Sequence, residues 1–249
     1  MSILKKIPKA PSLSCVEPKA LSGWINAHQT SKQAINLANI HLNQSSPNHV
    51  VLDDLFLTTK LDQVLNDLSK EKYWQRQRHT YSHLYVDSAT WQNTEQEQRF
   101  VQRDVWQRPA NTTNTAIAFL EFIRSAEFMA FVSQIFDVAI TDLNVADAQV
   151  NSNYFRLGCE DFVEQHADDS PGREVCMLLY LNKSWRSDYG GDLSFLGLRQ
   201  DVPIKITPRF NRCVLFRPDS KGSEHWVDKL ATKKTDLYRY NLTSWYWSE

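Results

Sequence analysis

Hydrophobic residues in the first half of the chain recur at helical spacing. The repeat is loose in residues 21–43, clear in residues 58–69 and strongest in residues 115–136, where a break is expected near Ser125. Each segment predicts an amphipathic helix with one face against a sheet. The best strand candidate between these helices is residues 79–86, in which apolar and polar residues partly alternate.

The pattern changes from Ala146 onward. Short runs rich in Val, Leu, Tyr and Phe follow one another, separated by Gly, Pro, Asp and Asn. Seven such runs predict a sandwich or barrel, so we expect a mostly β fold with a jelly-roll core and supporting N-terminal helices. Residues 1–145 are the predicted helical support and residues 146–249 the predicted core. Both belong to one domain, because no linker separates them.

The composition of the chain indicates which kinds of binding partner to expect. Hydrophobic residues make up 42% and charged residues 23% of the chain, and the net charge is −1, as in ordinary globular proteins. No basic field is available for a nucleic-acid backbone, and no apolar run approaches the roughly 20 residues of a membrane span. The N-terminal segment lacks a signal-peptide pattern, and the four cysteines form no CxxC pair. We expect a cytoplasmic protein without nucleic-acid or membrane partners; its oligomeric state stays open.

Three residues suggest a metal site. His166 and Asp168 lie two residues apart before an apolar run, and His225 opens another β-like run 59 residues later. Residues i and i+2 of an extended segment point to the same side, so this imidazole and carboxylate can meet at one ion. Two histidines and one carboxylate form the facial triad of non-haem Fe(II) oxygenases. With seven histidines in the chain, such a triple also arises by chance.

Arg239 and Tyr180 suggest a site for an anion. Arg239 lies in the last aromatic run, where a buried guanidinium needs an anionic partner. That partner is either a ligand carboxylate or an acid of the chain itself. Tyr180 lies in the run after the His-x-Asp motif and is either a second donor to the same anion or an aromatic residue of the barrel core.

The order of these motifs resembles a known family. HADD, MLLYLNKSWRSDYGGDLSF, ITPRFNRCVLFRPD, EHW and RYNLTSW follow one another as in prolyl-hydroxylase-like members of the Fe(II)/2-oxoglutarate-dependent oxygenase superfamily. The resemblance covers residues 146–247. It implies a double-stranded β-helix, the cupin-like form of the jelly roll. It also implies an enzyme that hydroxylates an aliphatic C–H bond, uses Fe(II), 2-oxoglutarate and dioxygen, and is assayed with ascorbate.

The resemblance also assigns roles to residues. His166, Asp168 and His225 match the iron ligands. Arg239 and Tyr180 match the residues that bind the distal carboxylate of 2-oxoglutarate. Leu193 matches an apolar wall of the cosubstrate pocket. An aromatic residue before the His-x-Asp motif matches a contact to the cosubstrate, and here it is either Tyr154 or Phe155.

The substrate is less defined by the sequence. Trp185 and Trp226 are expected near the pocket mouth, where they either contact a substrate or pack as aromatic rim residues. A prolyl group is favoured by the resemblance, but a free amino acid, another small molecule or a peptidyl substrate fits the same machinery. A different class also remains: a cupin-like metal-binding jelly roll, acting as an isomerase or binding module without oxygenase activity.

Overall fold

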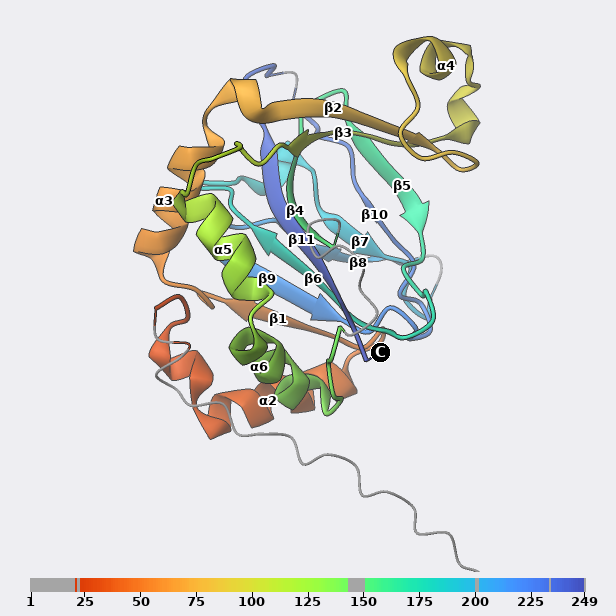
Figure 1. Ribbon diagram of the computed structural model, residues 1–249. Coiled ribbons are helices and arrows are strands. Elements are labelled where there is room, and N and C mark those ends of the chain that lie inside the picture. Colours follow the sequence, from red (N-terminus) through yellow and green to blue (C-terminus); the bar gives the residue numbers. More distant parts are fainter. Residues whose placement is uncertain (1–20, 22, 143–150, 200–201, 233, 249) are drawn as a thin grey trace, which may run out of the picture.

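Four helices form one layer of the molecule. The computed structural model describes residues 21, 23–142, 151–199, 202–232 and 234–248, so the predicted boundary between residues 145 and 146 lies outside the described residues. Figure 1 shows the helices gathered on one side of a curled sheet, and they are α2 (Lys32–Gln44), α3 (Thr58–Leu68), α5 (Thr115–Ile123) and α6 (Ala126–Phe136). The predicted break near Ser125 is confirmed, because its hydroxyl caps α6 by accepting from the Phe128 amide at 3.2 Å.

Within the described residues the sheet has eleven strands, and every pairing between them is antiparallel. The order is β1-β9-β6-β11-β4-β3-β5-β10-β7-β8, and β2 pairs with β3 off this path. The strands are β1 (His49–Asp53), β2 (Trp74–Thr80), β3 (Arg99–Trp106), β4 (Ser152–Leu157), β5 (Phe162–His166), β6 (Arg173–Tyr180), β7 (Leu193–Phe195), β8 (Ile204–Ile206), β9 (Arg212–Phe216), β10 (His225–Val227) and β11 (Arg239–Trp247). The chain thus forms the predicted double-stranded β-helix, with β5, β10, β7 and β8 curled over the longer strands.

Strand β6 lies between two hydrophobic cores. Its odd-numbered side chains, from Val175 to Leu179, pack with the helices. Its even-numbered side chains, from Cys176 to Tyr180, pack with Leu193 and Phe195 of β7, inside the curl of the sheet. Because both faces are buried, β6 is a continuous apolar run with no polar alternation. The inner core is the side on which the functional site lies.

The N-terminal half is not only helical support. It contributes β1, which pairs with β9, and the β2–β3 hairpin, whose connection carries the short helix α4 (Ser88–Asn93) away from the body of the molecule (Figure 1). The strand expected over residues 79–86 begins instead at Trp74 and ends at Thr80. Its polar sequence, WQRQRHT, forms a strand because register with β3 supplies the backbone partners. None of the described helices is long and apolar enough to cross a membrane.

Candidate metal centre and cosubstrate pocket

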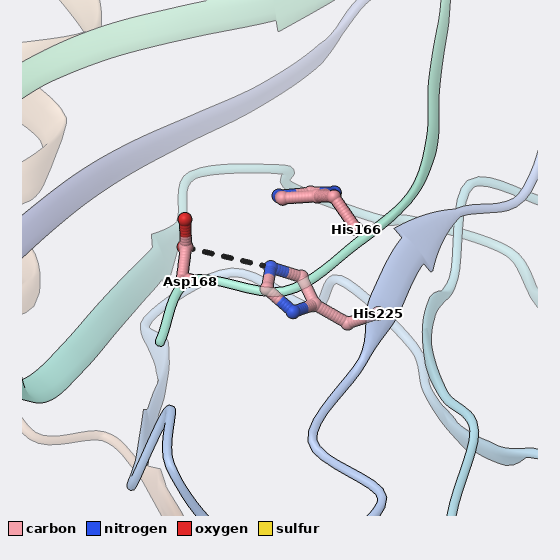
Figure 2. A group of neighbouring side chains, drawn as sticks. All are labelled: His166, Asp168 and His225. Carbon is pink, nitrogen blue, oxygen red and sulfur yellow. Dashed lines mark ion pairs between the residues drawn. The ribbon is translucent and has the colours of Figure 1, made fainter. Parts of the chain in front are cut away.

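Strand register brings the two histidines together. His166 ends β5, His225 begins β10, and the two residues are directly paired across these antiparallel strands. Their ring centroids lie 4.2 Å apart. Asp168 follows two residues after His166, and one ligand atom from each of the three side chains lies within 4.8 Å of the others (Figure 2). The residues singled out by spacing are thus adjacent in space.

Both imidazoles are held in the tautomer that a metal needs. Nδ1 of His166 lies 2.9 Å from the Glu164 carbonyl, and Nδ1 of His225 lies 3.0 Å from the Ser223 carbonyl. A carbonyl oxygen only accepts, so each Nδ1 carries the proton and each Nε2 keeps a lone pair for a ligand bond. Burial, reinforced by His166, lowers the pKa of His225 to about 4, so His225 is neutral at physiological pH.

The Asp168 carboxylate is oriented by donors from two long strands. Nη1 of Arg173, at the start of β6, donates to Oδ1 at 3.0 Å and to the Asp168 carbonyl at 2.9 Å. Nε1 of Trp245, on β11, donates to Oδ2 at 2.8 Å. Although burial favours the protonated acid, the nearby histidines and these donors outweigh it and lower the pKa of Asp168. Asp168 is therefore an anion with a fixed direction, which suits a divalent cation.

Arg239 lines the same inner cavity, and its guanidinium lies 4.9 Å from the centroid of the Tyr180 ring. Both side chains are 0% exposed. Arg239 Nε donates to the Gly191 carbonyl at 2.6 Å and Nη1 donates to Asn241 Oδ1 at 2.9 Å, while Nη2 and the Tyr180 hydroxyl have no partner among the described residues. Buried donors left without partners in this way are costly unless a ligand accepts from them. A carboxylate fits both, so this pair meets the requirement of the distal end of 2-oxoglutarate.

Further residues of this cavity follow from alternation along β11. Asn241, Thr243 and Trp245 share a face with Arg239 and line the inner cavity, as period-2 spacing from Arg239 would have indicated. Leu193 on β7 is fully buried and lines it too, at the place expected of an apolar wall. Gly191 is the residue that fixes Arg239. With φ +72°, it adopts a conformation that favours glycine, and a Cβ there would lie 3.1 Å from Arg239 Cδ.

The structure separates the two aromatic candidates on β4. Tyr154 points into the core beneath the helices, where its hydroxyl donates to the Ala116 carbonyl at 2.9 Å. Adjacent strand residues face opposite sides, so Phe155 points the other way and lines the outer part of the pocket. The assignment of Tyr154 to the cosubstrate is therefore wrong in geometry, and Phe155 is the aromatic residue that faces the site.

Neither tryptophan expected at the pocket mouth lies there. Trp226 stands between His225 and Val227, both of which line the cavity, so its side chain faces away and donates to Asp228 Oδ1 at 2.8 Å. Trp185 donates to the Gly190 carbonyl at 3.0 Å and packs edge-on against Tyr189, behind the Arg239 end. Both positions correct the expectation of a substrate contact, because strand alternation and turn packing orient these rings away from the open side.

The open side of the site leads into an outer cavity of about 540 Å³, within the range of small-ligand sites. Its lining includes Arg103, which the sequence did not single out, together with Phe155, His166 and Asp168. The signal that could have found Arg103 is its place on β3, two residues from Val101 and Val105, on the same inward face.

These features define a double-stranded β-helix with a cluster of two histidines and one carboxylate and, beside it, a buried arginine with a donor that has no partner among the described residues. The profile of the 2OG-Fe(II) oxygenase superfamily matches residues 150–247. The match covers the β-rich part of the chain, and the members of that superfamily use Fe(II), 2-oxoglutarate and dioxygen.

Three prolyl hydroxylases are similar to this chain in sequence or in structure. The mouse (Mus musculus) prolyl 3-hydroxylase OGFOD1 is 22% identical over 142 residues, which cover 55% of this chain and 24% of the mouse protein, about a quarter of its length. A prolyl-4-hydroxylase from Pseudomonas putida is 16% identical with a TM-score of 0.57, over 86% of this chain and 99% of that one. A Trichoplax adhaerens prolyl hydroxylase, solved with a hypoxia-inducible-factor peptide fragment, is 20% identical with a TM-score of 0.62, over 89% and 92%. At such identities the structural likeness establishes the fold.

Proposed function

We propose that this chain is an Fe(II)- and 2-oxoglutarate-dependent dioxygenase that hydroxylates an aliphatic C–H bond, with a prolyl group favoured as its target. One observation carries the proposal: the three metal-ligand candidates and Arg239 line one cavity, and Arg239 Nη2 is a buried donor without a partner among the described residues. The Tyr180 ring packs against the Arg239 guanidinium, and its buried hydroxyl also has no partner among those residues. A bound Fe(II) ion with 2-oxoglutarate and dioxygen supplies the oxidising power for such a bond, with succinate and carbon dioxide as coproducts.

The residues of the chain would divide this work among them. His166, Asp168 and His225 would hold the iron, with His225 neutral and the acid ionised. Arg239 and Tyr180 bind the distal carboxylate of 2-oxoglutarate, because the fork of a guanidinium matches a carboxylate and an ammonium does not. Apolar side chains around the centre, from Val163, Leu178, Leu193 and Val227, exclude water from the reacting atoms.

The prolyl preference is supported by the similarity of the chain to three prolyl hydroxylases. Small-molecule and peptidyl substrates are both compatible with the open outer cavity. A metal-binding jelly roll without oxygenase activity is the weaker alternative, because it gives no reason to bury Arg239 and Tyr180 with donors unmet.

The test separates metal, cosubstrate and substrate. Anaerobic protein with Fe(II) and 2-oxoglutarate should develop the weak visible band of an iron–oxoglutarate chelate, and His225→Ala should abolish it. His83→Ala is the matched control, since His83 is exposed and outside the cluster. In air with ascorbate, free proline, prolyl peptides and a metabolite extract are then offered in parallel. Succinate release coupled to one added oxygen atom on proline or a prolyl peptide supports the proposal. Coupling to a non-proline metabolite alone would remove the prolyl preference and leave the oxygenase.

We propose further that the protein works in a reducing compartment, the cytoplasm. The three described cysteines are free, and Cys176 and Cys213 are buried in the cores. Burial raises the pKa of both thiols, which keeps them protonated and inert. Cell fractionation followed by thiol labelling of the denatured protein should find it in the cytosolic fraction with reduced cysteines; a secreted or oxidised pool would refute this.

A further inference from the structure

The β2–β3 hairpin forms one wall of the outer cavity. Gln77 of β2 is paired with Arg103 of β3, and both face the cavity, as do the flanking residues His79, Val101 and Val105. His166 and Asp168 close the same cavity on its far side. A substrate placed at the metal would therefore touch this wall.

Arg103 is held rigidly on this wall. Its Nε donates to Gln77 Oε1 at 2.7 Å, and its guanidinium carbon lies 3.6 Å from the centroid of the Phe155 ring. The stacking on Phe155 and the hydrogen bond to Gln77 fix the plane of the Arg103 guanidinium. Its Nη1 and Nη2 atoms have no hydrogen-bond partner among the described residues. In the same part of the chain no carboxylate lies within ion-pair distance of Arg103, whereas Arg124, Arg156, Arg173 and Arg212, which are also buried or half-buried, each have such a partner.

Arg103 keeps its charge in this place. Burial lowers its pKa to about 10, opposed by attraction to Tyr85 and Asp168, so it is a cation at neutral pH. The neighbouring His79 does not share that charge. Its Nδ1 accepts from the Tyr85 amide at 2.9 Å, and burial, together with repulsion from Arg103, lowers its pKa to about 4. The wall thus offers one fixed positive fork beside neutral side chains.

The other cations of the pocket have different partners. Arg239 lies at the closed end, bonded to Gly191 and Asn241. Arg173 is bound to Asp168, and its guanidinium lies over the rings of Trp245 and Trp247. Arg103 is therefore the cation of the outer cavity whose fork is not engaged by a carboxylate among the described residues, and Arg239 does not line that cavity.

We propose that the substrate carries a carboxylate bound by Arg103, beside the carbon that is hydroxylated. The substrate class is thus a free amino acid, or a peptide whose C-terminal or acidic side-chain carboxylate lies next to the target residue. The inference rests on the proposed oxygenase function and adds a chemical requirement that iron and 2-oxoglutarate binding do not impose. Gln77 and Asn153, which line the same cavity, supply amide groups for the polar atoms that accompany such a carboxylate.

The experiment uses matched pairs that differ only in charge. Protein loaded with Mn(II) and 2-oxoglutarate is titrated, by calorimetry or ligand-observed NMR, with L-proline and L-prolinamide and with glycyl-proline and glycyl-prolinamide. A third pair, acetyl-Glu-Pro-amide and acetyl-Gln-Pro-amide, tests a side-chain carboxylate. In at least one pair the carboxylate should bind roughly 10- to 100-fold more tightly, as expected for charge-assisted hydrogen bonds. The pair that shows the preference identifies the source of the carboxylate.

Variants locate the effect. Arg103→Gln should remove the preference for the carboxylate and leave the affinity for the neutral partner and for 2-oxoglutarate within about twofold, whereas Arg103→Lys should keep part of it. Arg78→Gln, on the same hairpin but outside the iron cavity, is the matched control. The proposal is overturned if no carboxylate member binds more tightly than its neutral partner in the wild type. It is also overturned if Arg103→Gln weakens the binding of 2-oxoglutarate, or weakens the binding of the carboxylate and of its neutral partner equally. A failure of the oxygenase assignment would be distinct: the wild type would lack the Fe(II)–oxoglutarate band.

Discussion

Arg239 is the residue whose replacement tests the cosubstrate pocket most directly. In Arg239→Lys, one ammonium cannot hold the Gly191 carbonyl and also bind both oxygens of a carboxylate, as the Arg239 fork can. Loss of one charge-assisted hydrogen bond costs about 1.5–3 kcal/mol, which corresponds to roughly 10- to 100-fold weaker 2-oxoglutarate binding. Iron affinity should not change, because Arg239 contacts none of the three ligand candidates.

Thermal unfolding with Mn(II) in place of iron gives the assay. At a 2-oxoglutarate concentration of about 100 times the wild-type dissociation constant, binding stabilises the folded state by about 2.7 kcal/mol. For a chain of this size that raises the Tm by roughly 5–10 °C. After a 100-fold loss of affinity the same concentration contributes about 0.4 kcal/mol, or about 1 °C.

The ligand-free proteins supply the control. Arg239 Nη2 is buried without a partner among the described residues. Without ligand, the Tm of Arg239→Met should therefore lie at most a few degrees below that of the wild type. The rise in Tm that 2-oxoglutarate causes in the wild type should be absent from this variant. If Arg239→Lys keeps the full shift, the carboxylate anchor lies elsewhere. Arg212 and Arg217 are poor substitutes, since the first pairs with Asp53 and the second donates to the Phe136 carbonyl.

Three further substitutions test separate parts of the site. Trp245→Phe removes the donor to Asp168 Oδ2 and should weaken metal binding roughly 10- to 100-fold in a chelator competition; unchanged affinity would mean that Asp168 is oriented without it. Gly191→Ala places a methyl group 2.7 Å from Leu230 at a φ of +72° and should lower stability by about 1–3 kcal/mol in urea unfolding, with weaker 2-oxoglutarate binding. Tyr154→Phe removes the bond to Ala116 and should cost about 0.5–1.5 kcal/mol without altering the KM for 2-oxoglutarate, and an altered KM would return Tyr154 to the site.

The sequence predicted those features of the fold and of the site that follow from the spacing of residues within one helix or one extended segment. The helices over residues 58–69 and 115–136, the break at Ser125 and the double-stranded β-helix are confirmed, since apolar periodicity states them directly. His166 and Asp168 needed only the i, i+2 rule. The division at residue 145 stays a prediction.

The sequence did not predict on which face of the sheet a side chain lies where the inward-facing positions of its strand were unknown. Tyr154 and Phe155 are both aromatic, and the sequence does not state which face of β4 is the inner one until its partners β3 and β11 are placed. Trp226 was misplaced for the same reason, being adjacent to a ligand and therefore on the opposite face. Arg103 was missed because β2 and β3 contain too few apolar residues to mark them as strands of the sheet.

The pairing of β1 with β9 has a consequence for how the chain folds. His49 lies opposite Phe216 and Asp53 opposite Arg212, so this edge of the sheet closes only after more than 150 residues have been added beyond β1. Helices α2 and α3 also pack with α5 and α6, but the strand β9 that completes the core beneath them emerges from the ribosome much later. Contacts of such long sequence separation make folding slow. We expect refolding in the range of milliseconds to seconds or longer, with chaperone contacts concentrated on the first 70 residues during synthesis.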